Sequence, residues 1–349
     1  MKNIFGTDDH PYYVWAPRWI ESSAGIRCVH YLCHSLNAFG AKAFIVFAEP
    51  RLRGEPRVNP DLMTPELSTE LIDAHLSSGK VPIAIYPEDV IGNPLGAPIV
   101  VRILWNFAGA LGGPSSFDVD EIMVAFSETI AKDYEARGHA KPHVLFVPPV
   151  DPEEFPSTSE KEAFQVVYAG KYRSFVGRPP TVGTLPTVEI FRDGPKKQPR
   201  DLVKKLLADA SVVYSFENSS IVTEAILSGT PAGFVPNQFM GEIIAKEELG
   251  MGGTFIGDDP LAVTSARATL SEGRASYLRA VERFPSELEF FYSMTQRVAS
   301  TLGFSGPITL PSIGSPVTRN RILLGLRLLK TKGLRAFIVE VDRFLRSRL

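Results

Sequence analysis

The chain has 349 residues, which exceeds the usual size of one compact domain and suits two domains of about 150 residues each. Hydrophobic residues make up 44% of the chain and charged residues 22%, which is typical of a globular protein and excludes a disordered or fibrous one. The formal net charge of −2 excludes a global positive field that would recruit nucleic acid.

The N-terminal sequence lacks the positive start and apolar run of a secretory signal, and no stretch reaches the roughly 18 uninterrupted apolar residues of a membrane span. We therefore expect a cytoplasmic protein. The two cysteines, Cys28 and Cys33, fall in one expected helix, where a five-residue offset points their side chains apart. We expect buried free thiols rather than a disulfide.

The first half alternates strand and helix patterns. A strand is predicted over 12–16, a helix with apolar side chains at helical spacing over 22–39, and a second strand over 43–48. Further strands are predicted over 81–86, 121–127 and 143–147. Because strand-helix-strand units build parallel sheets with right-handed crossovers, residues 1–150 are expected to form a Rossmann-like, doubly wound domain.

A proline-rich and acidic stretch over 147–155 interrupts this pattern and marks a domain boundary. Beyond it, the patterns predict strands over 164–169, 187–191, 211–216 and 232–235, with helices over 199–208 and 221–228. We therefore expect a second doubly wound α/β domain over residues 151–315, followed by C-terminal helices.

Residues 316–349 form a basic segment with amphipathic spacing. From Arg319 onward it carries seven Arg and two Lys against two acidic residues. Two interpretations stay open: a helix that lies on the anionic inner face of the plasma membrane, or a terminal helix packed across the two domains with a solvated basic face.

Ligands of open parallel sheets bind beyond the carboxyl ends of the strands, so the loops that leave strands are the places to search. The first is Ser22-Ser-Ala-Gly25, where Gly25 allows close approach and the helix N-terminus offers free amides to an anion. A plain helix cap is the alternative.

The second loop is Glu217-Asn-Ser-Ser220, again between a strand and a helix. The hydroxyls of Ser219 and Ser220, with Asn218 beside them, suit a diphosphate that also gains from the helix dipole. Glu224 lies about one turn into the helix, where an ionised carboxylate accepts hydrogen bonds from a ribose diol. The alternative is an ordinary first-turn acid.

A third loop, Tyr86 to Pro94, leaves an apolar strand of the first domain and is expected to face the cleft between domains. Glu88 or Asp89 could act there as a general base or orient an acceptor hydroxyl. The prolines around these acids also suit a rigid turn with no catalytic role.

Four segments together resemble a GT-B glycosyltransferase of the group-1 kind, as found in bacterial capsule, lipopolysaccharide and cell-wall sugar assembly. The segments are residues 23–30, 148–155, 168–171 and 217–231. In that family two glutamates separated by seven residues head the helix that grips the donor. Here Glu217 and Glu224 are separated by six, and Ala225-Ile-Leu-Ser-Gly-Thr-Pro231 follows as in the family.

The resemblance implies transfer of a sugar from a nucleotide-diphosphate sugar to a glycan or glycolipid hydroxyl, with retention of configuration. It places Glu224 on the donor ribose, Glu217 toward the donor sugar and Lys171, after Gly170, on the diphosphate. A surface charge is the alternative for Lys171. No further cofactor is implied.

Donor binding is expected without an obligatory metal, because Asp118-Val-Asp120, which resembles the metal triplet of the GT-A fold, precedes its strand instead of following it. An inverting displacement with Glu88 or Asp89 as base stays open. So do two other functions on the same fold: a non-catalytic nucleotide-sugar or glycan-binding relative, and a sugar-nucleotide epimerase.

Overall fold

The computed structural model describes residues 9–47, 57–158, 160–192, 194–238 and 240–311. The chain divides into two compact units. The first holds the described residues up to Val147 and those from Phe284 onward, and the second is Pro148–Arg283. The second unit therefore ends earlier than the expected domain over 151–315, because the second half of α9 Leu270–Ser300, the last helix of the described residues, packs in the core of the first unit. The basic segment 316–349 lies outside the described residues.

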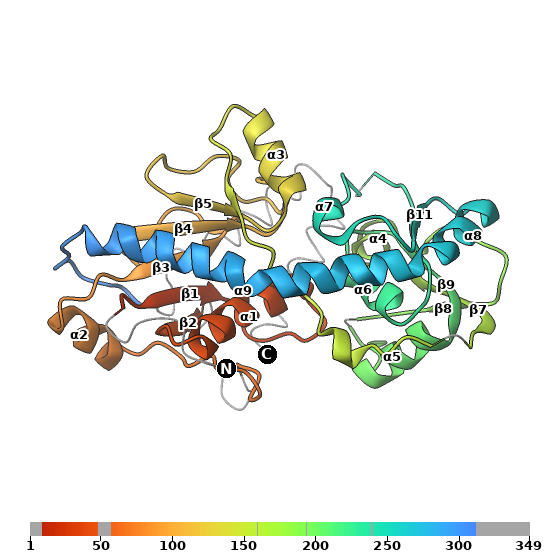
Figure 1. Ribbon diagram of the computed structural model, residues 1–349, viewed down its shortest axis with the longest axis horizontal. Helices are drawn as coiled ribbons and strands as arrows, with labels where there is room; N and C mark the ends of the chain where they lie inside the picture. The colour runs from red at the N-terminus through yellow and green to blue at the C-terminus, as the bar shows by residue number, and fades with distance from the viewer. Residues whose placement is uncertain (1–8, 48–56, 159, 193, 239, 312–349) are drawn as a thin grey trace. The chain divides into compact units, whose positions relative to one another are not determined.

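The first unit is built on a six-stranded sheet with the order β2-β1-β3-β4-β5-β6, and all its pairings are parallel (Figure 1). The strands are β1 Tyr12–Ala16, β2 Ala43–Phe47, β3 Ile83–Pro87, β4 Ile99–Leu104, β5 Ile122–Ala125 and β6 His143–Val144. Its helices are α1 Ala24–Ala38, α2 Thr69–Ser77 and α3 Glu128–Ala136, joined by the second half of α9 Leu270–Ser300.

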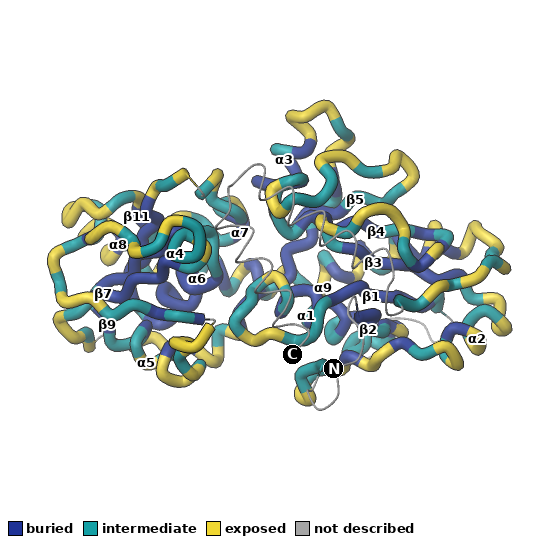
Figure 2. The backbone as a smooth tube through the Cα atoms, turned by 180° about the vertical axis from the view of Figure 1, so that it is seen from behind, coloured by how far each residue is buried: buried dark blue, intermediate teal, exposed yellow. Residues whose placement is uncertain are grey.

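Both faces of this sheet are covered. Tyr12 and Val14 point to a core that includes α1 and Phe291 of α9, whereas Tyr13 and Trp15 point to a second core that includes Ile72 of α2. Figure 2 shows the strands buried almost throughout. The two cysteines lie on α1 as buried free thiols, as expected.

Strand β4 is the element of this sheet that the sequence patterns did not predict. Its apolar run contains Arg102, whose side chain is fully buried. A buried guanidinium needs a partner, and the carboxylate of Glu121 accepts two hydrogen bonds from Arg102, of 2.8 and 2.9 Å. Glu121 belongs to a later segment of the chain. The residue pattern of β4 alone therefore did not reveal that this strand lies inside the sheet.

The second unit is built on a five-stranded parallel sheet with the order β11-β10-β9-β7-β8. The strands are β7 Glu162–Tyr168, β8 Thr187–Glu189, β9 Ala210–Ser215, β10 Ala232–Phe234 and β11 Thr254–Ile256. The helices are η1 Pro152–Glu154, α4 Gly170–Val176, α5 Arg200–Asp209, α6 Ser220–Leu227, α7 Lys246–Leu249, α8 Pro260–Ala268 and the first half of α9.

Helices lie on both faces of this sheet as well. Helices α5 and α6 contact β9, and α8 contacts β10 and β11. Val167, Val212 and Tyr214 form a core with Ala266 of α8. The expected pair of Rossmann-like, doubly wound α/β domains is confirmed. Within the described part of the chain, no helix is long and apolar enough to cross a membrane.

The strand order places one switch point in each sheet. In both units the first strand lies between the second and the third, so the chain leaves it in one direction and later returns on the other side. Such an order opens a crevice at the carboxyl ends of the first and third strands. Ligand sites are therefore expected after β1 and β3 in the first unit, and after β7 and β9 in the second.

Candidate functional site

The switch point of the second unit joins Lys171 and Glu217. Lys171 follows β7 and Glu217 follows β9, and these strands are neighbours in the sheet. The backbone nitrogen of Lys171 donates to Oε2 of Glu217 at 3.0 Å. Two residues that the sequence placed on a donor therefore lie side by side at the edge where ligands of this fold bind.

Gly170 makes this approach possible. Its φ is +46°, which favours glycine. A Cβ at this position would lie 2.5 Å from Cδ and Oε1 of Glu217. Only glycine therefore lets the backbone of the loop after β7 lie directly against the carboxylate.

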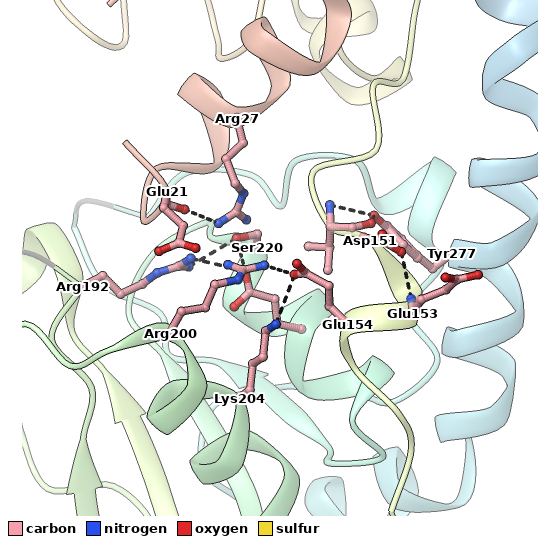
Figure 3. Close-up of polar contacts among 12 residues, drawn as sticks. Glu21, Arg27, Asp151, Glu153, Glu154, Arg192, Arg200, Lys204, Ser220 and Tyr277 are labelled. Carbon is pink, nitrogen blue, oxygen red and sulfur yellow. Dashed lines mark hydrogen bonds and ion pairs between the residues drawn. The ribbon is translucent and has the colours of Figure 1, made fainter. Parts of the chain in front are cut away.

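A second polar group lies at the first turn of α6. Oγ of Ser220 donates to Oε1 of Glu224 at 3.0 Å. Arg192, from the loop after β8, donates to Ser220 Oγ and to Glu224 Oε1, both at 3.3 Å. Figure 3 shows Arg192 directed at Ser220. All three side chains are buried, so Glu224 is an internal, paired carboxylate rather than an exposed first-turn acid.

Asn218 and Ser219 have structural partners of their own. Asn218 donates from Nδ2 to the carbonyl of Glu242 at 3.0 Å and accepts at Oδ1 from the nitrogen of Ile244 at 3.1 Å. Oγ of Ser219 caps α6 by accepting from the nitrogen of Ile221 at 3.4 Å. Asn218 therefore ties down the loop before α7, and Ser219 orients the helix that carries Glu224.

The connection that enters the second unit is fastened to it. Glu154 binds Arg200 and pairs with Lys204 at 3.6 Å, as Figure 3 shows. The hydroxyl of Tyr277 accepts from the nitrogen of Val150 at 3.0 Å and donates to the carbonyl of the same residue. The hinge-like segment 148–155 is thus held by α5 and α9 from Val150 onward.

The switch point of the first unit contains Glu88, the residue directly after β3. Its side chain is 2% exposed. Oε2 accepts from the nitrogen of Trp105 at 3.1 Å, whereas Oε1 is buried with no hydrogen-bond partner. Burial, and then the negative charge of Asp89, raise the pKa of Glu88 to about 8. Asp89 itself is exposed.

A buried carboxyl group with one oxygen unpaired and a raised pKa is a candidate for proton transfer or for binding a ligand hydroxyl. Glu88 and Asp89 lie directly after β3, at the switch point of the first unit. That their loop faces a cleft between the two domains stays a prediction.

Arg102 holds the loop that carries these acids. Its guanidinium donates to the carbonyls of Pro87 at 3.2 Å, Val90 at 2.7 Å and Gly92 at 2.9 Å. A Cβ at Gly113 would lie 2.6 Å from the carbonyl oxygen of Glu88, so another loop packs directly on this one. Glu88 is therefore fixed by its surroundings.

Gly25 lies at the start of α1, after β1, on the other side of the same switch point. The helix begins after Ser23, whose side chain forms no capping hydrogen bond. Gly25 is exposed and a Cβ there would meet nothing within 4 Å. The structure shows open space at this turn, as close approach of a ligand requires.

The described residues contain no group of three His, Cys, Asp or Glu side chains that could hold a metal ion. Metal-independent binding therefore stays a prediction, since an absent cluster does not exclude a metal held by a substrate.

Sequence reasoning missed two residues of these sites. Arg192 comes shortly after β8, so the search for polar residues after strands would have found it. Arg102 lies within a strand, where a lone basic residue gives no local sign of its role. Its partners become visible only when the loop after β3 and Glu121 are placed around it.

No family model matches the sequence, and a search of curated proteins finds no match. Among solved structures, WaaG, described as a glycosyltransferase involved in lipopolysaccharide biosynthesis, is 11% identical, with 83% of this chain and 99% of that chain covered and a TM-score of 0.43. A glycosyltransferase from Rickettsia africae is 10% identical over 83% and 99%, with a TM-score of 0.49. The galactosyltransferase WaaB is 13% identical over 86% and 100%, with a TM-score of 0.44. At such low identity these matches say nothing about residue roles.

Proposed function

We propose that this protein transfers a sugar from a nucleotide-diphosphate sugar to a hydroxyl of a glycan or glycolipid, with retention of configuration, in the assembly of a cell-surface polysaccharide. One observation carries the proposal: the backbone nitrogen of Lys171 donates to the carboxylate of Glu217 across the switch point of the second unit. A carboxylate held beside a glycine-containing turn and a lysine is suited to a donor whose diphosphate leaves as the sugar is transferred.

In the proposed donor site, Glu224 accepts the ribose hydroxyls and Lys171 offsets the charge that grows on the leaving diphosphate. The N-terminus of α6, capped by Ser219, adds its dipole to the binding of the same anion. Glu217 lies toward the sugar itself, where its charge favours the positive character that develops at the anomeric carbon.

In the proposed acceptor site, Glu88 orients the attacking hydroxyl. Its buried Oε1 gives that hydroxyl a hydrogen-bond partner at the switch point of the first unit. Under the inverting alternative Glu88 would be the general base. It would then have to lose its proton first, and activity would rise with pH up to about 8, which is the pKa of this carboxyl.

A binding screen tests the donor site. UDP, GDP, ADP and dTDP are added to the protein and the thermal unfolding midpoint is followed. We expect one of them to raise the midpoint, because a ligand that binds only the folded state stabilises it. No stabilisation by any of the four would contradict the donor site.

Turnover is tested with Glu217→Gln. The amide oxygen of glutamine can still accept from Lys171, so the geometry is kept and the charge is lost. We expect kcat to fall by roughly 10² to 10³, with the affinity for the nucleotide within about threefold of the wild type. Lys205→Met, a change in an exposed ion pair of α5, is the control. Unchanged turnover in Glu217→Gln would remove Glu217 from the mechanism.

Nuclear magnetic resonance of the product decides the stereochemistry. A product whose anomeric configuration matches that of the donor supports retention. An inverted linkage would contradict retention and favour a single displacement in which Glu88 is the general base. Binding of nucleotide-sugars without transfer to any of a panel of acceptors would instead favour a non-catalytic relative, and consumption of donor without acceptor would favour an epimerase.

A further inference from the structure

Glu224 forms a buried pair with Arg192. The proposed role of Glu224 in binding ribose gives no role to this arginine. Arg192 comes from the loop after β8, on one side of the switch point, whereas Glu224 lies on α6, which follows β9 on the other side. The two residues are 8% and 1% exposed. Removing both charges from water costs free energy, which an exposed ion pair does not have to offset. The burial of this pair therefore needs an explanation of its own.

Arg192 is placed so that it holds the carboxylate of Glu224 in position. Nη2 of Arg192 donates to Oε1 of Glu224 and Nη1 donates to Oγ of Ser220, each at 3.3 Å. Ser220 then donates to the same Oε1 at 3.0 Å. Three side chains thus close a ring of hydrogen bonds, and the planar fork of the guanidinium sets the direction of the two bonds that Arg192 donates.

This ring fixes the carboxylate of Glu224. Two donors reach the same oxygen, so rotation of the carboxylate would break both bonds at once. A fixed carboxylate binds a diol more tightly than a mobile one, because the loss of side-chain entropy has already occurred in the free protein.

We infer that Arg192 is the positioning residue of the ribose site: it holds Glu224 in the orientation that accepts the 2′- and 3′-hydroxyls of the donor nucleotide. This inference rests on the proposed function, which assigns the ribose to Glu224. It adds that discrimination between a ribonucleotide and a 2′-deoxyribonucleotide depends on an arginine in a different loop.

A direct role for Arg192 at the diphosphate is the competing explanation, since a guanidinium also binds phosphate. The two explanations differ in one measurable respect. An arginine that acts through Glu224 affects the ribose hydroxyls, whereas one that binds phosphate affects ribonucleotides and deoxyribonucleotides alike.

The experiment measures the affinities of UDP, GDP and ADP and of their 2′-deoxy counterparts by calorimetry. The variants are Arg192→Met, Arg192→Lys, Glu224→Gln and the double variant Arg192→Met with Glu224→Gln. Arg267→Met is the matched control, because Arg267 donates to the carbonyl of Ser211 near the start of β9, at the opposite end of that strand from the site. Circular dichroism verifies that each variant is folded.

For the wild type we expect the ribonucleotide that binds to be preferred over its deoxy form by roughly tenfold, as for a hydrogen bond to a charged group. Arg192→Met should reduce this ratio to nearly one and leave the deoxynucleotide affinity within about threefold. Arg192→Lys should restore part of the ratio, since the charge is kept and the fork is lost. The double variant should lose no more than Glu224→Gln alone, because the two residues act as one unit.

If Arg192→Met does not fold, the double variant and Arg192→Lys carry the test, because neither leaves an unpaired buried carboxylate. The parent is the wild type for Arg192→Lys and Glu224→Gln for the double variant. Equal loss of affinity for ribonucleotides and deoxynucleotides relative to that parent, with the ratio unchanged, would overturn the inference and leave the donor site standing. Failure of the wild type to bind any of these nucleotides, or dTDP, would instead reject the donor site, and this inference with it.

Discussion

The backbone nitrogen of Lys171 donates to the carboxylate of Glu217 at 3.0 Å, although 46 positions separate the two residues in the sequence. Strands β7 and β9 are adjacent and parallel, so the residues that follow them emerge at the same edge of the sheet. Topology brings these two residues together, and the positive φ of Gly170 lets them touch. The proposed donor site depends on this contact.

Gly170→Ala tests the contact. A methyl group at Gly170 would lie 2.5 Å from the carboxylate of Glu217 and would occupy a left-handed backbone conformation. We expect a loss of stability of about 1–2 kcal/mol from the backbone strain. We also expect weaker nucleotide binding, because Glu217 and the turn must move apart. Thermal unfolding and calorimetry measure the two effects.

Gly79→Ala is the matched control. Gly79 has a φ of +67°, and a Cβ there would meet nothing within 4 Å. It should lose comparable stability and keep the full nucleotide affinity. An equal affinity in the two variants would show that the approach of Gly170 to Glu217 has no part in binding.

Glu88→Gln should change how stability depends on pH. Burial and Asp89 raise the pKa of Glu88 to about 8, against an ordinary value of 4.5. Between these values the native protein binds a proton that the unfolded chain has released. The wild type therefore loses stability as pH rises through this range, by up to about 1.4 kcal/mol per pH unit for this group.

Because glutamine does not titrate, the variant should gain stability relative to the wild type between pH 5 and pH 8. Denaturant unfolding at pH 5, 7 and 9 measures the difference. Glu66→Gln, at an exposed ion pair of the same unit, should leave the wild-type slope in place. A constant difference between Glu88→Gln and the wild type at all three pH values would contradict the raised pKa.

Arg102→Met should destabilise the first unit strongly. The change leaves the carboxylate of Glu121 nearly buried without its partner and removes the donors that bind three carbonyls of the loop after β3. Breaking a buried pair in this way costs about 3–5 kcal/mol.

Lys132→Met is the comparison, since the side chain of Lys132 is 57% exposed and pairs with Glu128 at 3.8 Å within α3 of the same unit. Such a surface pair is worth about 0–1 kcal/mol. Denaturant unfolding of both variants measures the difference. Similar losses in the two variants would show that the Arg102 pair is not the anchor of the Glu88 loop.

Asn218→Ala separates a structural role from a ligand role. Asn218 makes two hydrogen bonds to the segment before α7, so its loss should cost about 1–3 kcal/mol of stability. Nucleotide affinity should stay within about threefold of the wild type. Asn59→Ala, which loses one exposed hydrogen bond to the nitrogen of Asp61, is the control. A tenfold loss of affinity at unchanged stability would restore Asn218 to the donor site.

Local patterns in the sequence predicted the class of fold and most of its strands. The alternation of apolar strands with amphipathic helices follows from periods of two and 3.6 residues, which every such segment carries within itself. Strand β1 and the unit of β9, α6 and β10 were predicted within one or two residues. The rule that ligands bind after parallel strands also pointed to Glu88 and Glu217, and the family resemblance pointed to Lys171, before any contact was known.

Contacts between distant segments were decided only by the tertiary structure. The order of the strands determined that Lys171 meets Glu217, and the loop after β8 brought Arg192 to Glu224. Burial of Glu88 raised its pKa, and the second half of α9 joined the first unit through its apolar face. The reason is that desolvation and ion pairing depend on which groups surround a side chain, and those neighbours come from elements far along the chain.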